Sequence, residues 1–139
     1  RANRLSPQLR EAVEYAQDLT RDNRSMTLSV AFDYGGRAEI LEAVRRIVSD
    51  GIEPELIDEA LFNRYLHTSH LPDPDLIIRT AGELRLSNFL LWQSAYSEYY
   101  PTPTLWPDLG EAELAGAMES FSHRERRFGA LQPEHKSAG

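Results

Sequence analysis

Hydrophobic residues follow two different periods along the chain, and each period predicts one type of secondary structure. In four stretches, apolar positions repeat every three or four residues, which predicts four amphipathic helices. Ser6 and Pro7 are expected to begin the first helix, as its N-cap and its first helical residue. Asp108, with Glu111 three residues later, is expected to cap the last helix. The predicted helical ranges are 7–22, 36–51, 55–66 and 109–129.

Strand-like patterns occupy other stretches of the chain. Residues 27–34 alternate between larger apolar and smaller side chains, as a strand with one buried face does. Residues 76–78 form a short continuous apolar run, which is typical of a strand buried on both faces. Residues 96–102 are expected to be extended, and residues 88–94 are expected to form a short helix capped by Ser87.

Strands separated by helices of these lengths indicate βαβ crossovers. The predicted fold class is therefore α/β, with a mostly parallel central sheet flanked by helices. Two or three strands are fewer than the roughly five or six of an average sheet, so these residues predict only part of one. We expect residues 1–139 to form a single domain and residues 132–139 to form a flexible tail.

Composition narrows the possible functions. The chain has 15 Lys and Arg against 22 Asp and Glu, a net charge of −7, which argues against a nucleic-acid binder because phosphate backbones attract positive charge. It has no cysteine, which excludes disulfide scaffolds, thiolate metal sites and cysteine nucleophiles. No apolar run approaches the roughly 20 residues of a membrane span. We therefore expect a cytoplasmic protein, with a peripheral membrane contact left open.

The loop after residues 76–78 carries the most informative side chains. Arg79 and Arg85 lie on either side of a glycine, and Ser87 precedes the predicted short helix. Ligands of open parallel sheets bind at the carboxyl ends of strands. Two guanidinium groups, a hydroxyl and a helix N-terminus at that place suit a diphosphate. In the alternative interpretation, both arginines lie on a solvated loop and pair with Glu83, and the spacing alone does not decide between the two.

Glu98 is the candidate metal ligand. One carboxylate beside a bound diphosphate is enough to help hold Mg²⁺, because this ion keeps most of its waters and is held largely by substrate phosphates. The alternative is that Glu98 is a solvated surface charge, as most glutamates are.

Several blocks of the sequence have a distinctive order. Residues 34–40 read YGGRAEI and residues 73–93 read DPDLIIRTAGELRLSNFLLWQ. They are followed by YSE at 96–98, LWPD at 105–108 and RERRFG at 124–129. In this order, the blocks closely resemble the signature of the cis-prenyltransferases, the undecaprenyl-diphosphate-synthase-like enzymes. The resemblance extends from about Leu5 to Gly129.

The resemblance implies an enzyme that condenses isopentenyl diphosphate with an allylic prenyl diphosphate to form Z double bonds. It implies Mg²⁺ as the cofactor, a homodimer, and delivery of long lipid products to the membrane surface. The positions that match binding sites for the isopentenyl diphosphate head group are Arg79, Arg85, Leu86 and Ser87. Arg127 and Gly129 match a terminal Arg-x-Gly element that reaches toward the diphosphate across the dimer. Glu98 matches a carboxylate of the Mg²⁺ site, often supplied by the partner subunit.

Two residues and one motif depart from the family pattern. Ala81 stands where Gly or Ser is usual, and Asp33 stands where Asn commonly precedes Tyr-Gly-Gly-Arg. The family's Asp-Gly-Asn-Gly-Arg-like loop supplies the key aspartate and grips the allylic diphosphate, and residues 1–139 contain no such motif. We therefore expect no catalytic residue in this chain. We interpret it as the C-terminal portion of a cis-prenyltransferase that carries the isopentenyl diphosphate-binding half and is inactive alone.

Two other functions stay open. A non-catalytic partner subunit of a heteromeric cis-prenyltransferase would lend its Arg-x-Gly tail to an active subunit, but it would not need Arg79, Arg85 and Ser87 together. A plain phosphate-binding domain would show no Mg²⁺-dependent preference for diphosphates over monophosphates.

Overall fold

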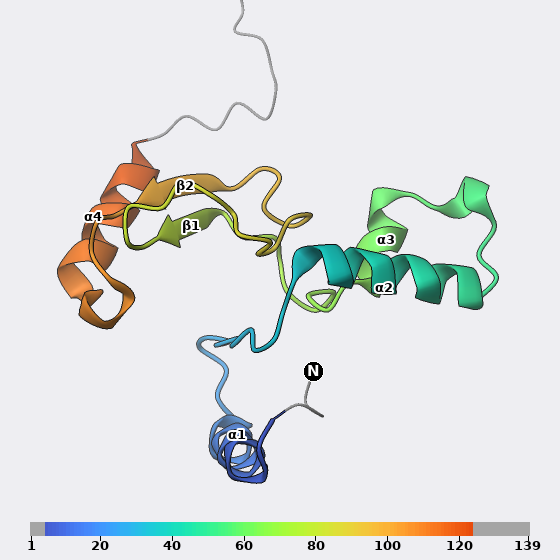
Figure 1. The fold of residues 1–139 in the computed structure, drawn as a ribbon, viewed down its shortest axis with the longest axis horizontal. Helices are drawn as coiled ribbons and strands as arrows, with labels where there is room; N and C mark the ends of the chain where they lie inside the picture. Colours follow the sequence, from blue (N-terminus) through green and yellow to red (C-terminus); the bar gives the residue numbers. More distant parts are fainter. Residues whose placement is uncertain (1–4, 124–139) are drawn as a thin grey trace, which may run out of the picture.

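Helix α1 (Pro7–Thr20) begins where the sequence predicts it. In the computed structural model, which describes residues 5–123, the Ser6 hydroxyl accepts a hydrogen bond from the Leu9 backbone N–H at 3.2 Å. Pro7 occupies the first helical position, where its missing N–H costs nothing. None of the residues of α1 is buried, and Figure 1 shows α1 standing apart from the other elements.

The core lies between α2 (Gly36–Ser49) and α3 (Glu59–Tyr65), which pack side by side (Figure 1). On α2, Ala43 and Ile47 are buried in the core, whereas Leu41, Val44 and Val48, which the apolar pattern of the sequence also assigns to the buried face, are exposed. The buried apolar cluster consists of Ala43, Ile47, Leu61, Phe62 and Leu66. Trp92 packs on the edge of this cluster, with its ring centroid 4.5 Å from that of Phe62.

The sheet is parallel, as predicted, and has two strands among the described residues. Strand β1 (Leu76–Arg79) pairs with β2 (Glu98–Pro101), with Leu76 opposite Glu98 and Arg79 opposite Pro101. The run at 76–78 predicts burial on both faces, but β1 is half-buried throughout. Among the described residues β1 pairs with β2 alone.

Helix α4 (Glu111–Ser122) packs against β2 (Figure 1). The prediction that Asp108 caps it is wrong, because Asp108 ends a 3₁₀-helix, Trp106–Asp108, and Gly110 is the N-cap. The Glu113 carboxylate instead accepts a hydrogen bond from the Gly110 backbone N–H at 3.3 Å. The predicted continuation to residue 129 lies outside the described residues.

The single helix predicted over residues 55–66 is interrupted. A 3₁₀-helix, Pro54–Leu56, is followed by extended backbone at Ile57 and Asp58, and only then does α3 begin. The Asp58 carboxylate accepts a hydrogen bond from the Leu61 backbone N–H at 2.7 Å. An aspartate that can cap a new helix favours a break over continuation.

The strand predicted over residues 27–34 is wrong for this structure. This segment is irregular, and the side chains of Leu28 and Val30 are about four-fifths exposed. A strand needs a hydrogen-bonded neighbour and a surface to cover, and the described residues offer this segment neither.

The short helix predicted over residues 88–94 is also wrong. Ser87, Asn88 and Leu90 have φ values of +48°, +65° and +44°, which a right-handed helix does not tolerate. This segment forms successive turns instead.

No helix in residues 5–123 has the length and apolar character needed to cross a bilayer.

Candidate functional site

Arg79 ends β1 at the carboxyl edge of the sheet, where parallel sheets place their ligands. The loop that follows is fixed to the chain after β2 by backbone hydrogen bonds. The N–H groups of Ala81 and Gly82 donate to the carbonyls of Thr104 and Thr102 at 2.9 and 2.8 Å. The two loop residues need left-handed backbone for this, with φ of +62° and +64°. The start of the loop is therefore held in one place.

Arg79 and Ser87 meet across this loop. The Arg79 Nη2 atom donates a hydrogen bond to Ser87 Oγ at 2.9 Å, closing a span of eight residues. The Nε atom of Arg79 is buried and has no hydrogen-bond partner. A buried guanidinium N–H without an acceptor is costly, and an anion in the loop would satisfy it.

Arg85 has a different partner. Its guanidinium donates two hydrogen bonds to the Glu83 carboxylate, one of them from Nη2 at 2.7 Å. Hydrogen bonding between these two side chains is the main reason that the pKa of Glu83 is lowered and the pKa of Arg85 is raised. The interpretation that the arginines pair with Glu83 therefore describes Arg85, whereas Arg79 bonds to Ser87. The Arg85 side chain is 73% exposed.

Ser87 does not open a helix, so the predicted helix N-terminus is absent from this place. The left-handed backbone at Ser87 and Asn88 turns the chain toward α2 instead. Leu86, the fourth head-group candidate, closes a turn through its carbonyl, which accepts from the Phe89 N–H at 3.0 Å.

The N-terminus of α2 receives the segment after Ser87. Asn88 accepts a hydrogen bond from the Gly36 N–H on its carbonyl at 2.7 Å and another from the Arg37 N–H on its side-chain Oδ1 at 2.9 Å. Asn88 lies about fifty positions after Gly36 and Arg37 in the sequence. The sequence pattern therefore does not reveal that these residues meet.

Glu39 is a buried carboxylate next to this junction. It is 2% exposed and accepts hydrogen bonds from the Tyr34 hydroxyl at 2.5 Å, the His67 N–H at 2.8 Å and the Gln93 side-chain amide at 3.1 Å. Burial, followed by the hydrogen bond to Glu39, raises the pKa of the Tyr34 phenol well above its ordinary value. Three donors allow a carboxylate to remain inside the protein.

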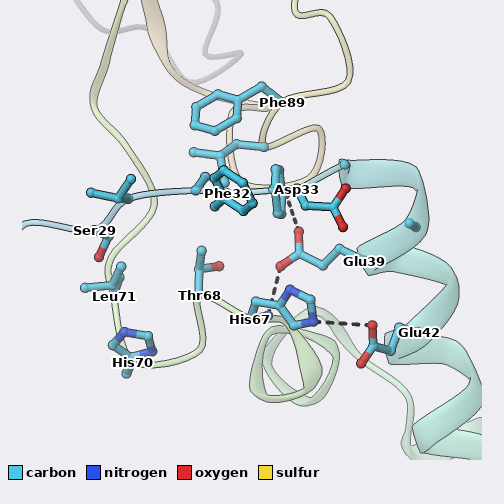
Figure 2. Close-up of a pocket in the computed structure, with 16 residues that line it drawn as sticks. Ser29, Phe32, Asp33, Glu39, Glu42, His67, Thr68, His70, Leu71 and Phe89 are labelled. Atoms are coloured by element: carbon cyan, nitrogen blue, oxygen red, sulfur yellow. Dashed lines mark hydrogen bonds and ion pairs between the residues drawn. The ribbon is translucent and has the colours of Figure 1, made fainter. Parts of the chain in front are cut away.

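A cavity of about 520 Å³ lies beside Glu39. Figure 2 shows Glu39 and Glu42 on one side of it, with dashed lines from both to His67. The cavity wall also includes the segment 29–35, of which residues 29–33 are exposed, and the ring of Phe89. The ring of Phe89 meets that of Tyr34 edge-on, at 5.7 Å between centroids.

Glu98 lies away from the Arg79–Ser87 pair. Glu98 begins β2 and pairs with Leu76, which lies three residues before Arg79 on β1. At the usual rise of a strand, Glu98 and Arg79 are therefore about 10 Å apart along the strand direction. Because side chains alternate along a strand, these two residues also face opposite sides of the sheet. One chain therefore does not bring Glu98 to Arg79. Arg127 and Gly129 lie outside the described residues.

Sequence reasoning missed the roles of Asn88 and Glu39. A usable signal existed for each. Gly35 and Gly36 begin a helix without a capping side chain, which predicts a cap from elsewhere. Glu39 lies four and eight positions before Ala43 and Ile47, on the core face of α2, where a charge requires partners.

Comparison with known proteins identifies the family. The profile of the family described as "Putative undecaprenyl diphosphate synthase" matches residues 1–129. The isoprenyl transferase of Fusobacterium nucleatum is 51% identical over 132 residues, which cover 95% of this chain and 56% of that protein. The isoprenyl transferase of Streptococcus pyogenes is 53% identical over 137 residues, which cover 93% of this chain and 55% of that protein.

Two solved structures have the same fold. A lavandulyl diphosphate synthase from Lavandula x intermedia, in complex with dimethylallyl diphosphate, superposes with a TM-score of 0.84 at 47% identity, covering 91% of this chain and 56% of that one. A probable undecaprenyl diphosphate synthase from Campylobacter jejuni gives a TM-score of 0.78 at 33% identity, covering 93% of this chain and 60% of that one.

The parallel α/β fold and these matches place the chain among the prenyltransferase families. The chain belongs to the undecaprenyl-diphosphate-synthase-like family of cis-prenyltransferases, as its sequence blocks predict. It spans little more than half the length of the curated relatives that it matches.

Proposed function

We propose that this chain carries the isopentenyl diphosphate-binding part of a cis-prenyltransferase. The observation that supports this most is the Arg79–Ser87 pair at the carboxyl end of β1, with its unpartnered Arg79 Nε. A diphosphate oxygen placed there would accept the free N–H and a hydrogen bond from the serine hydroxyl. Charge-assisted hydrogen bonds of this kind are about twice as strong as neutral ones.

Arg85 and Leu86 would complete the head-group site. Arg85 would leave Glu83 and turn its guanidinium toward the second phosphate, which its exposure permits. Loss of the Arg85–Glu83 ion pair would offset only a small part of the binding free energy gained at the phosphate. An exposed ion pair contributes only about 0–1 kcal/mol. Arg127 and Gly129, from the sequence resemblance, would contribute at the same diphosphate.

The reaction would join two isoprenoid diphosphates. The allylic C–O bond breaks, the alkene of isopentenyl diphosphate forms a new C–C bond to that carbon, and loss of a proton leaves the Z double bond. Arg79, Arg85 and Ser87 would hold isopentenyl diphosphate by its head group so that its alkene is oriented toward the allylic carbon. The residues that act on the allylic diphosphate would lie outside this chain.

The described residues of one chain do not bring Glu98 to the Arg79–Ser87 pair, so Mg²⁺ bound there would need a carboxylate from elsewhere. When bound, the ion would neutralise charge on diphosphate oxygens. The described residues hold no cluster of three or more His, Asp or Glu suited to a metal, and Glu98 lies at the far end of the sheet from Arg79. We therefore propose a homodimer in which Glu98 serves a diphosphate held by the partner subunit. A cytoplasmic location with peripheral membrane contact is part of the same proposal.

Calorimetric titration of isopentenyl diphosphate into the chain tests the head-group site. Arg79→Ala should weaken binding at least about tenfold, since a hydrogen bond to a charged group contributes about 1.5–3 kcal/mol. Arg21→Ala is a matched control, because Arg21 is exposed and pairs only locally, with Asp18 at 3.3 Å. Equal affinity in wild type and Arg79→Ala would reject the assignment.

A non-catalytic partner subunit of a heteromeric cis-prenyltransferase is the second candidate function. Such a subunit would raise the activity of a full-length relative when the two are mixed. The proposed function predicts that the chain alone incorporates no labelled isopentenyl diphosphate. Robust incorporation by residues 1–139 alone would contradict it.

A further inference from the structure

Helix α2 begins without a capping group of its own. Its N-cap is Gly35, which has no side chain, and the N–H groups of Gly36 and Arg37 need acceptors from elsewhere. Asn88 supplies both acceptors, its carbonyl to Gly36 at 2.7 Å and its Oδ1 to Arg37 at 2.9 Å. The geometry is that of an N-cap residue, provided from 51 positions away in the sequence.

The junction is close and leaves no space for larger residues. A Cβ atom on Gly35 would lie 2.7 Å from Asn88 Nδ2, and a Cβ atom on Gly36 would lie 2.9 Å from Leu91 Cγ. Both distances are shorter than a van der Waals contact. Asn88 itself has a φ of +65°, in the left-handed region that asparagine tolerates better than most residues. The two glycines and Asn88 therefore fit together as one joint.

Ser87 is the residue next to this joint. It also has left-handed backbone, with φ of +48°, and its hydroxyl receives the hydrogen bond from Arg79. The loop that follows β1 is thus held at both ends, by Thr102 and Thr104 near its start and by the N-terminus of α2 at Asn88. Without the second attachment, two consecutive residues in left-handed backbone would have little to keep them there.

We propose that Asn88 is a positioning residue for the head-group site: by capping α2 it holds the Ser87 hydroxyl in line with Arg79. This inference rests on the proposed function of that loop. Asn88 would not touch the diphosphate. Its effect would pass through the backbone of Ser87, and it would make the site pre-formed before the ligand arrives.

The test compares two capping residues. Asn88→Gly removes the side-chain cap but keeps a residue that adopts left-handed backbone easily. Asp58→Ala removes the cap of α3, where Asp58 Oδ1 accepts from the Leu61 N–H at 2.7 Å, and serves as the matched control. Urea unfolding should show a stability loss for Asp58→Ala at least as large as that for Asn88→Gly, because replacing a capping residue by alanine costs more than replacing it by glycine.

The affinity for isopentenyl diphosphate should distinguish Asn88→Gly from Asp58→Ala. Asn88→Gly should weaken binding about tenfold, and Asp58→Ala less than twofold, at a temperature where both variants are folded. Equal weakening in both variants, or wild-type affinity in Asn88→Gly, would overturn the proposal. If Arg79→Ala keeps wild-type affinity, the proposed function fails, whereas a loss in Arg79→Ala without one in Asn88→Gly refutes only the role of Asn88.

A measurement without ligand gives a second readout. In Asn88→Gly, the backbone amide of Ser87 should show a lower NMR order parameter and that of Arg37 faster hydrogen exchange. Asn88→Asp keeps the Oδ1 acceptor and should restore both amides to wild-type behaviour. An unchanged Ser87 amide in Asn88→Gly would overturn the proposal.

Discussion

Arg79 and Glu98 lie at opposite ends of two paired parallel strands. Arg79 is the last residue of β1, opposite Pro101, and Glu98 is the first residue of β2, opposite Leu76. The strand register also places them on opposite faces of the sheet. A diphosphate bound by Arg79 is therefore out of reach of Glu98 in the same chain, and joint action of the two requires two copies.

The first prediction follows from this separation. Glu98→Gln should abolish the Mg²⁺-dependent part of isopentenyl diphosphate binding, and Arg79→Ala should weaken binding itself at least about tenfold. Mixing the two variants should recover part of the Mg²⁺-dependent binding, because a mixed dimer contains one site with both residues intact. Recovery is measured by calorimetry on the mixture. No recovery, with dimers of both kinds present, would show that the two residues do not share a site.

The second prediction concerns Ala81, which has a φ of +62°. Left-handed backbone costs a non-glycine residue about 1–2 kcal/mol, which glycine avoids. Glycine also has more conformational freedom in the unfolded chain, which destabilises the folded state by about 0.4–1 kcal/mol and opposes this gain. Ala81→Gly should therefore raise the free energy of unfolding by up to about 1.6 kcal/mol. The control, Ala12→Gly on exposed α1, should lower it by about 0.5–1 kcal/mol. A loss of stability in Ala81→Gly would contradict the left-handed turn.

The third prediction concerns Gly36. A Cβ atom there would lie 3.1 Å from the Leu91 backbone nitrogen as well as 2.9 Å from Leu91 Cγ. Gly36→Ala should therefore destabilise the protein by about 1–3 kcal/mol, the usual cost of overpacking. Gly116→Ala on α4 is the control, since its Cβ would meet only the Tyr100 hydroxyl at 3.4 Å. That variant should gain about 0.5–1 kcal/mol from helix propensity, and urea unfolding measures both.

The fourth prediction is a pH dependence from Tyr34. Burial, the hydrogen bond to Glu39 and the charge of Glu39 raise the pKa of Tyr34 above its unfolded value near 10. The neutral phenol is thus favoured in the folded state, so this stabilisation is complete below about pH 10 and is lost as pH rises further.

Urea unfolding at pH 8 and pH 11 checks this dependence. The decrease in stability between the two should be smaller in Tyr34→Phe than in wild type. Tyr15→Phe, at an exposed tyrosine of α1, should leave the decrease unchanged. A decrease in Tyr34→Phe as large as that of wild type would show that Tyr34 does not carry this dependence.

The sequence predicts best those elements that are stabilised by residues close to one another in the chain. Helix α1 has its own cap at Ser6, and α2 shows the helical period of Ala43 and Ile47, so both are found where expected. Residues 27–34 have a strand pattern but no neighbour to pair with among residues 5–123. A strand depends on such pairing more than a helix does, so its pattern alone was not sufficient.

The candidate site also combines contacts between residues close in sequence with contacts between residues far apart in sequence. Arg79 and Ser87 are close in sequence and form a hydrogen bond, and the family resemblance, rather than their spacing alone, predicts that they act together. The junction at Asn88 depends on Gly36, far earlier in the chain, and it changes the segment after Ser87 from a predicted helix to a series of turns. Glu39 and its donors are likewise brought together only by the packing of α2 against the later segments.

The most direct test of the central claim maps isopentenyl diphosphate onto the chain by NMR. Titration into the isotope-labelled protein should shift the backbone amides of residues 79–88, with the largest changes at Arg79 and Ser87. Inorganic phosphate at the same concentration should produce much smaller shifts, because it offers a single phosphate to the two arginines. Shifts confined to the cavity beside Glu39, or an absence of shifts in residues 79–88 at saturating ligand, would contradict the account.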